Sequence, residues 1–145
     1  MPLYTEKLRP NQYKFDLSQI EEPENTSFLN LSNKSSKLIH SAFKLIRNYD
    51  IRSVDFTNVQ MHDDNIRLLA SYLRTNPNLR SVTLDENPFT DEGLRMITQE
   101  LKTNTKLSHL SIFGCPNITD DGMSELCEVI RQINTCLFQV DVDVE

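Results

Sequence analysis

The chain has 145 residues, of which 38% are hydrophobic and 25% are charged, and its formal net charge is −6. These values are typical of one soluble globular domain and exclude a disordered polymer. No apolar run reaches the roughly 18 residues that a membrane-spanning helix needs, and the N-terminus lacks a signal-peptide core. We therefore expect one domain that does not contact a membrane.

The charge is unevenly distributed along the chain. Residues 1–106 hold 14 basic and 14 acidic residues, whereas residues 107–145 hold one base, Arg131, and seven acids. Such an acidic end repels nucleic acid and anionic lipid, and it attracts a basic protein surface. The expected partner is therefore a protein with a basic surface, and we expect no nucleic-acid partner.

The three cysteines are unevenly spaced, at Cys115, Cys127 and Cys136. This pattern argues against a disulfide framework and favours a reducing, cytoplasmic environment.

The first 25 residues differ from the rest, and we call them the arm. They hold three of the six prolines and an acidic run within residues 21–24. Apolar and polar residues alternate in the middle of the arm, as in a short strand. Two roles stay open, which are a cap over the first repeat and a linear segment that docks on a partner. In the second role the contact residues are aromatic: Tyr4, Tyr13 and Phe15.

From residue 26 to residue 145 the chain alternates between strand and helix patterns, giving about four repeats and a terminal strand. The first repeat is abbreviated. Leu29 and Leu31 mark its strand, and we expect its helix to begin after Ser35 or Ser36.

The clearest repeat runs from Leu79 to Leu107 and matches the pattern L-x-x-L-x-L-x-x-N-x-L. A Thr-Asp-x-Gly turn follows the strand, and then comes a helix with an apolar face at Leu94, Ile97 and Leu101. Neither the strand nor the helix can bury its apolar face alone. We expect the Asn87 amide to bond the backbone of its own turn and of the neighbouring repeat. Asn104 is expected to end the helix as a left-handed cap.

The same unit occurs on both sides of this repeat, because Ile51, Leu79 and Leu107 are 28 residues apart. The fourth repeat carries Cys115 at the position of Asn87. Its inward helix positions are predicted to be Met123, Leu126 and Ile130. Cys127 takes the helix position of Ala70, which we expect to be small and semi-buried.

These units resemble the leucine-rich repeats of the ribonuclease-inhibitor-like class over about residues 26–145. Cys115 and the residues after it look like a cysteine-containing repeat, and the Asn-Thr-x-Leu junctions are similar to the C-terminal domain of tropomodulins. The resemblance implies an α/β fold, a short leucine-rich-repeat solenoid. Its parallel β-sheet would form the concave side and its helices the convex side, and the class is used to bind proteins. Val59 replaces the asparagine of the second repeat, which breaks the asparagine ladder.

Side chains that point away from the core on successive strands form three columns on the concave face. Phe113 has no role in the core, so it is the expected anchor for a partner, with acids around it that select a basic one. The alternative is an ordinary solvated acidic face that carries one aromatic residue. The candidate partner-binding residues on this face are Asp55, Asp85, His109, Phe113, Asp141 and Asp143.

No pattern for catalysis is found in the sequence. Acidic pairs recur at the helix starts, where N-capping and the helix dipole explain them. The cysteines and histidines have no metal-ligand spacing, and phosphate-binding and nucleophile motifs are missing. We therefore expect no enzyme activity, no cofactor and no metal.

The predicted function is a non-catalytic interaction or scaffold subunit of a larger intracellular hetero-complex of cytoskeletal or ciliary type. Two alternatives are a regulator of a small GTPase, as in the Ran GTPase-activating proteins that look like this class, and an assembly factor.

Overall fold

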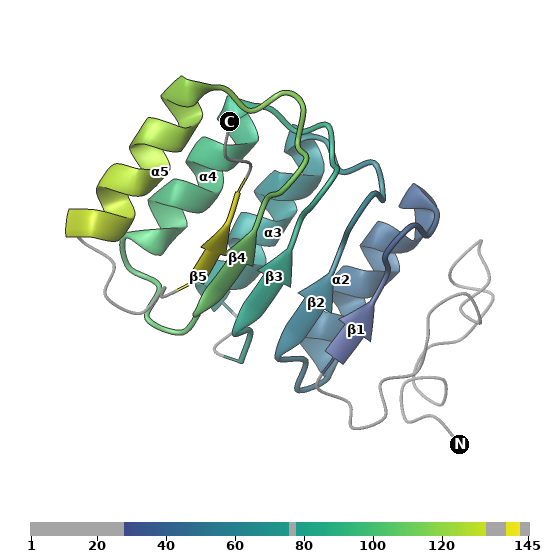
Figure 1. Ribbon diagram of the computed structural model, residues 1–145. Helices are drawn as coiled ribbons and strands as arrows, with labels where there is room; N and C mark the ends of the chain where they lie inside the picture. The colour runs from purple at the N-terminus through teal and green to yellow at the C-terminus, as the bar shows by residue number, and fades with distance from the viewer. Residues whose placement is uncertain (1–27, 76–77, 133–138, 143–145) are drawn as a thin grey trace, which may run out of the picture.

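The protein is a single curved stack of strand and helix units, seen in a computed structural model that describes residues 28–75, 78–132 and 139–142 (Figure 1). Five strands form one parallel sheet in the order β1-β2-β3-β4-β5. Their bounds are Phe28–Asn30 (β1), Ser53–Asp55 (β2), Ser81–Thr83 (β3), His109–Ser111 (β4) and Gln139–Asp141 (β5).

The helices all cover one face of this sheet and leave the other face open (Figure 1). They are a short 3₁₀ helix, η3 (Ser36–Leu38), and the α-helices α2 (Ile39–Asn48), α3 (Asp63–Thr75), α4 (Asp91–Leu101) and α5 (Asp120–Gln132). α3 packs against α4, and α4 packs against α5. The predicted α/β solenoid of short leucine-rich repeats is confirmed.

The strand register confirms the repeat spacing that the sequence predicts. Ser53 pairs with Ser81, Ser81 with His109, and His109 with Gln139. The next residue of each strand points towards the helices, and Val54, Val82 and Leu110 are buried there. The core is therefore one continuous layer between the sheet and the helices, to which every described repeat contributes.

Asn87 is a fully buried polar residue that joins two repeats. Its Oδ1 accepts hydrogen bonds from the backbone N–H groups of Val59 and Met61, at 3.1 and 3.0 Å. Its Nδ2 donates to the carbonyl oxygens of Phe56 and Leu84, at 2.8 and 2.9 Å. The predicted bonds to its own turn and to the neighbouring repeat are confirmed.

Cys115 occupies the same position in the fourth repeat and is also buried. Its thiol donates to the carbonyl of Leu84, at 3.2 Å between Sγ and O. A thiol is a weak donor and a weak acceptor, whereas an amide has two N–H donors and a carbonyl acceptor, so the Cys115 side chain has less capacity for hydrogen bonds than Asn87.

Replacing Asn87 by Ala should lower the free energy of unfolding by about 3 kcal/mol, because buried backbone groups of two repeats lose their partners. Chemical denaturation followed by circular dichroism measures this change. Asn117→Ala is the matched control, since Asn117 is exposed and makes one bond, to the carbonyl of Pro88 at 2.7 Å. Equal losses for the two variants would contradict the role of Asn87.

The first acid of a helix holds the start of the next helix, a contact that we call the helix-start clamp. Asp63 accepts hydrogen bonds from the N–H and the hydroxyl of Thr90, at 2.8 and 2.7 Å. Asp91 accepts the same two bonds from Thr119, with the N–H at 2.8 Å. Thr90 in turn caps its own helix, because its hydroxyl accepts from the Glu92 N–H. The acidic pairs thus connect repeats as well as favouring helix starts.

The clamp explains the glycine of the Thr-Asp-x-Gly motif. A Cβ atom on Gly93 would lie 2.6 Å from Oδ1 of Asp63, and one on Gly122 would lie 2.3 Å from Oδ1 of Asp91. A side chain at either position would push the carboxylate out of the clamp. In the second repeat, Asn65 takes the position of this glycine. Its Oδ1 accepts a hydrogen bond from the N–H of His62 at 2.9 Å.

The clamp also alters the titration of Asp91. Partial burial by itself would raise the pKa of Asp91, but the hydrogen bonds from Thr119 and Gly122 and the positive charge of Arg95 outweigh it. The net effect lowers the pKa of Asp91 below its ordinary value of 3.8. The clamp therefore stabilises the fold in full above pH 3.8, and this contribution is lost as the pH falls through the lower pKa of the folded protein.

Asp91→Asn should destabilise the protein near neutral pH by about 1 kcal/mol, and this difference from the wild type should shrink as the pH falls below 3.8. Urea denaturation at several pH values measures it. Asp120→Asn is the control, because Asp120 takes the same place in α5 but has no described helix after it. A difference for Asp91→Asn that does not depend on pH would contradict the clamp.

Two expectations about the helices were wrong. Asn104 is not left-handed; its Nδ2 donates to the carbonyl of Leu73 at the end of α3, at 3.0 Å. Its Oδ1 accepts from the N–H groups of Lys106 and Leu107, so the residue links two repeats instead of capping one helix. Cys127 is exposed, although Ala70 at the same helix position is buried.

Of the three predicted inward positions of α5, only Leu126 is fully buried, while Met123 and Ile130 are partly buried. The matching residues of α4, Leu94 and Leu101, are fully covered. The reason is that α5 has a neighbouring helix on one side only among the described residues.

Within the described parts of the chain, none of the helices has the length and apolar character needed to cross a membrane.

Candidate protein-binding face

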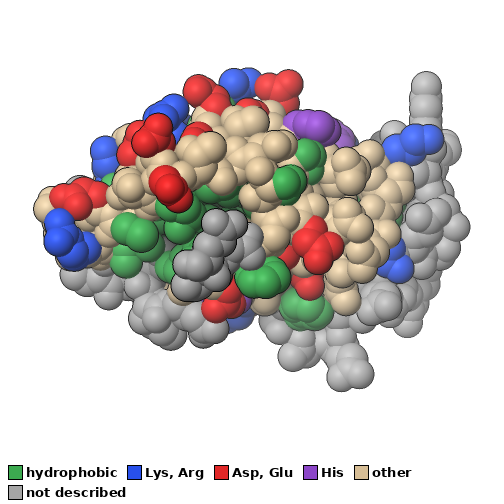
Figure 2. Space-filling view, turned by 45° about the horizontal axis from the view of Figure 1, so that its top comes forward, with side chains coloured by type: hydrophobic (Ala, Val, Ile, Leu, Met, Phe, Trp, Pro, Cys, Tyr) green, Lys and Arg blue, Asp and Glu red, His purple; other side chains and the backbone are tan. Residues whose placement is uncertain are grey.

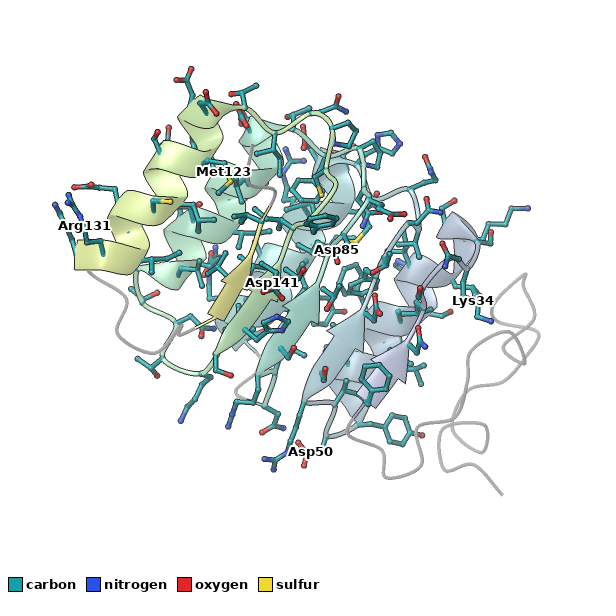
Figure 3. All side chains as sticks on the ribbon, viewed as in Figure 1. Lys34, Asp50, Asp85, Met123, Arg131 and Asp141 are labelled. Carbon is teal, nitrogen blue, oxygen red and sulfur yellow. The ribbon has the colours of Figure 1, made fainter. Side chains whose placement is uncertain are left out.

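The candidate site is the open, concave face of the sheet, and its polar side chains lie near the carboxyl ends of the strands. Asp85 and Asp141 lie on this face (Figure 3). The column Asp55, Thr83, Ser111 and Asp141 crosses the sheet from β2 to β5 in register, as the sequence predicts. Arg52 and Arg80 precede β2 and β3 at the opposite ends of these strands, and Arg52 there pairs with Asp50, with Nη2 3.3 Å from Oδ2.

His109 connects three strands of this face. Its Nδ1 lies 2.8 Å from Oγ of Ser81 on β3, and its Nε2 lies 2.8 Å from Oδ2 of Asp141 on β5. The carboxylate of Asp141 can only accept a hydrogen bond from the ring, whereas the hydroxyl of Ser81 can donate to it or accept from it. The side chains of His109 and Asp141 are 24% and 47% exposed, so a partner can reach both of them.

Asp85 holds the backbone of Phe113, which is the expected anchor for a partner. Its Oδ1 accepts from Oγ of Ser111 at 2.5 Å and from the backbone N–H of Phe113 at 2.8 Å. The next residue, Gly114, has a φ of 71°, a left-handed conformation that glycine adopts without strain. The Phe113 backbone is thus held on both sides, while its ring is 53% exposed.

Asp55 has a different role from the other acids. Its Oδ1 accepts from the N–H and the hydroxyl of Thr57, at 2.8 and 2.6 Å, and so it stabilises the turn after its own strand. The structure therefore brings His109 and Asp141 together, and it places Asp85 against Phe113, but it leaves Asp55 two strands away from His109.

Comparison with known proteins agrees with this geometry. A profile of the family described as Leucine Rich repeat matches residues 75–97 and 103–127. These segments contain β3 and β4 and the first parts of α4 and α5, and the two strands pair in register in the structure. The chain contains leucine-rich repeats. No curated protein sequence matches it.

Two solved structures show the same fold as this leucine-rich-repeat protein. One is titled Leiomodin-1 Actin-Binding Site 2 and is 21% identical, with a TM-score of 0.75, covering 86% of this chain and 73% of that one. The other is the tropomodulin C-terminal domain of Caenorhabditis elegans, which is 18% identical, with a TM-score of 0.71, covering 81% of this chain and 74% of that one. At these identities the likeness establishes the fold, and the similarity to tropomodulins that the repeat junctions suggest is confirmed at that level.

Some predicted contact residues lie outside the described parts of the leucine-rich-repeat protein. They are Asp143 and the three aromatic residues of the arm, Tyr4, Tyr13 and Phe15. Their assignment stays a prediction, as does the division into an arm and a repeat domain.

Sequence reasoning missed one residue of the concave face, Phe28. It pairs with Ser53 and so begins the column of Ser81 and His109, and its side chain is 43% exposed. The signal was available, because Leu29 aligns with Val54 and therefore places Phe28 beside Ser53. The shorter spacing of the first repeat hid this alignment.

The described residues contain no group of three or more His, Cys, Asp or Glu side chains that could hold a metal ion. The concave face presents an exposed aromatic residue, a histidine and carboxylates, and these groups suit the recognition of a protein surface.

Asp85→Ala should lower the free energy of unfolding by about 1 kcal/mol, because Ser111 and the Phe113 N–H lose their acceptor. Phe113→Ala should leave stability nearly unchanged, since the ring is half exposed. Thermal unfolding of both variants measures the difference. A large loss for Phe113→Ala would mean that the ring serves the core and not the surface.

Proposed function

We propose that this protein is a non-catalytic binding module whose concave face holds a protein partner of a cytoskeletal assembly. Phe113 carries the proposal, because its ring is 53% exposed on a face where the neighbouring strands present polar groups. An exposed aromatic ring on a rigid backbone loses little conformational entropy on binding, and such residues dominate many interfaces.

The charged groups around the ring determine which partner fits. Asp85 and Asp141 lie on either side of the strand that leads to Phe113, and the side chain of Asp141 is 47% exposed. A partner with a lysine or arginine beside an apolar residue would satisfy the acids and cover the ring. This arrangement supports the expectation of a basic partner surface and of a hetero-complex.

The solved structures suggest where to look for the partner. One of them is titled as an actin-binding site and the other belongs to tropomodulin. We therefore propose actin as the first candidate and a cytoplasmic setting for the complex. A ciliary assembly and the scaffold role remain finer alternatives within the same proposal.

The test is co-sedimentation of the full chain with actin filaments, and a parallel binding titration with monomeric actin. Phe113→Ala should weaken binding by about 2 kcal/mol, which is roughly thirtyfold, whereas the folded state should be unaffected. Leu68→Ala is the matched control, because Leu68 is also a large apolar residue, 43% exposed, but lies on α3.

Three results are informative. Selective loss with Phe113→Ala supports both the face and the partner. Actin binding that resists Phe113→Ala would overturn the concave face as the site. No binding to either form of actin would overturn the choice of partner.

The arm is a second proposed contact. A Tyr13→Ala, Phe15→Ala double variant that keeps its thermal stability but loses partner binding would support docking, and a loss of stability alone would support a cap over the first repeat.

A further inference from the structure

Helix α3 holds α4 through four positions along one flank. Asp63 clamps Thr90, as described above, and Ile66 lies against Gly93, whose added Cβ would be 3.4 Å from the Cβ of Ile66. Further along, Ala70 is buried, and Arg74 binds Glu100 through Nη2 and through Nε, at 3.1 Å for Nε. Glu100 is itself nearly buried, with a side chain that is 10% exposed.

Helix α4 holds α5 in a similar way. Asp91 clamps Thr119, and Thr98 at the place of Ala70 is buried. An ion pair again crosses the boundary, here between Arg95 and Glu125, with Nε 3.1 Å from Oε2. Each helix therefore presents a flank that is built to receive the next one.

Helix α5 repeats the flank of α3 position by position. A shift of 57 residues brings the four contact positions of α3 onto α5, and at each position the residue has the same kind of side chain. The carboxylate, the large apolar residue, the small residue and the arginine of this α5 flank are Asp120, Met123, Cys127 and Arg131. Arg131 is the only base after residue 106, and it occupies the place of Arg74. Met123 and Arg131 are labelled on α5 in Figure 3.

Burial shows that the α5 flank lacks the cover that the other two flanks have. Ile66 and Leu94 are fully buried but Met123 is not, and Ala70 and Thr98 are buried but Cys127 is exposed. Beside Met123 the end of the core opens as a hollow of about 650 Å³, lined also by Ile112, Ile118 and Val142. Hydrophobic side chains are visible at this end of the stack, among charged ones, on the left of Figure 2.

The occupant must bring what α4 brings to α3. That is a Ser or Thr at the helix start, a glycine at the third helical position and a carboxylate at the tenth, where α4 carries Thr90, Gly93 and Glu100. Any side chain at the third position would meet the Asp120 carboxylate, as it would meet Asp63 in the existing contact. A carboxylate at the tenth position would pair with Arg131, whose present partner, Glu128, lies on its own helix at 2.9 Å.

The arm does not match this chemistry, because the glycines of the sequence are Gly93, Gly114 and Gly122 and none lies in the arm. A second copy does not fit either, because its glycine-bearing edges on α4 and α5 are already covered by α3 and α4.

We infer that the α5 flank is a further docking surface, which takes a helix of a partner protein with a Ser or Thr N-cap, a glycine at position three and a carboxylate at position ten. A leucine-rich repeat of the partner has this chemistry, and it would continue the stack of α3, α4 and α5 with the same contacts. This surface is separate from the concave face, and the partner helix would lie beside α5 on the side away from α4.

The test uses α4 as the probe helix, in two forms. In the first, a copy of residues 85–112 follows Val142 in the full chain, since Val142 and Leu84 stand at the same point of the repeat. In the second, a peptide with the sequence of residues 88–104 is titrated against the natural chain, which keeps the test valid if the extended chain does not fold. The readout in both is the rate of alkylation of Cys127, resolved by mass spectrometry.

We expect the copy, and saturating peptide, to slow the alkylation of Cys127 by about tenfold or more, because reaction then needs local opening of the contact. The copy should also raise the unfolding midpoint, as an added repeat does in a solenoid. Asp120→Ala, made in the extended chain and in the natural chain, should abolish both effects while leaving the stability of the natural chain nearly unchanged. Gly93→Leu within the probe is the matched control and should give no protection.

Two outcomes would overturn the inference. In the first, neither probe slows alkylation, or the protection survives both Asp120→Ala and Gly93→Leu. In the second, sedimentation equilibrium shows that the natural chain forms a dimer in which Cys127 is protected, which would make a second copy the occupant.

Discussion

The fold depends on hydrogen bonds that cross from one repeat to the next. No strand or helix of this protein can bury its apolar side alone, so each unit is stable only against its neighbours. The apolar core supplies most of the free energy, but it does not fix the distance and direction between units. Asn87, the helix-start clamps at Asp63 and Asp91, and Asn104 do so, because each bonds a specific backbone group or hydroxyl of an adjacent repeat.

This constraint also explains why the concave face can serve for binding. Neighbouring strands are held in register at every boundary that the structure describes, so side chains from distant parts of the sequence stand side by side. His109 reaches Ser81 and Asp141, which are 28 and 32 residues away along the chain. Asp85 holds the backbone of Phe113 across one repeat. A rigid sheet thus presents a ring and its polar neighbours at little entropic cost when a partner binds.

The flank of α5 differs from the flanks of α3 and α4 in how far it is covered. Where a helix follows, as after α3 and α4, the flank is buried and its carboxylate is bonded. At α5 the flank carries the same kinds of residue and is open. The concave face and the α5 flank are therefore two surfaces of different chemistry, one recognising charge around an aromatic ring and the other recognising a helix by its cap and its glycine.

The sequence by itself determined the repeat length, the strand register and most of the buried residues, because the two hydrophobic periods and the 28-residue spacing depend on local pattern alone. It also singled out Asn87, whose amide had to meet buried backbone groups. Only the tertiary structure decided the partners of Asp63, Asp91 and Asn104, since these bonds reach into a repeat that the local pattern does not include. It also decided that Met123 is only partly buried and that Cys127 is exposed. The burial of a helix flank depends on whether another helix lies beside it, and the sequence pattern within α5 does not show this.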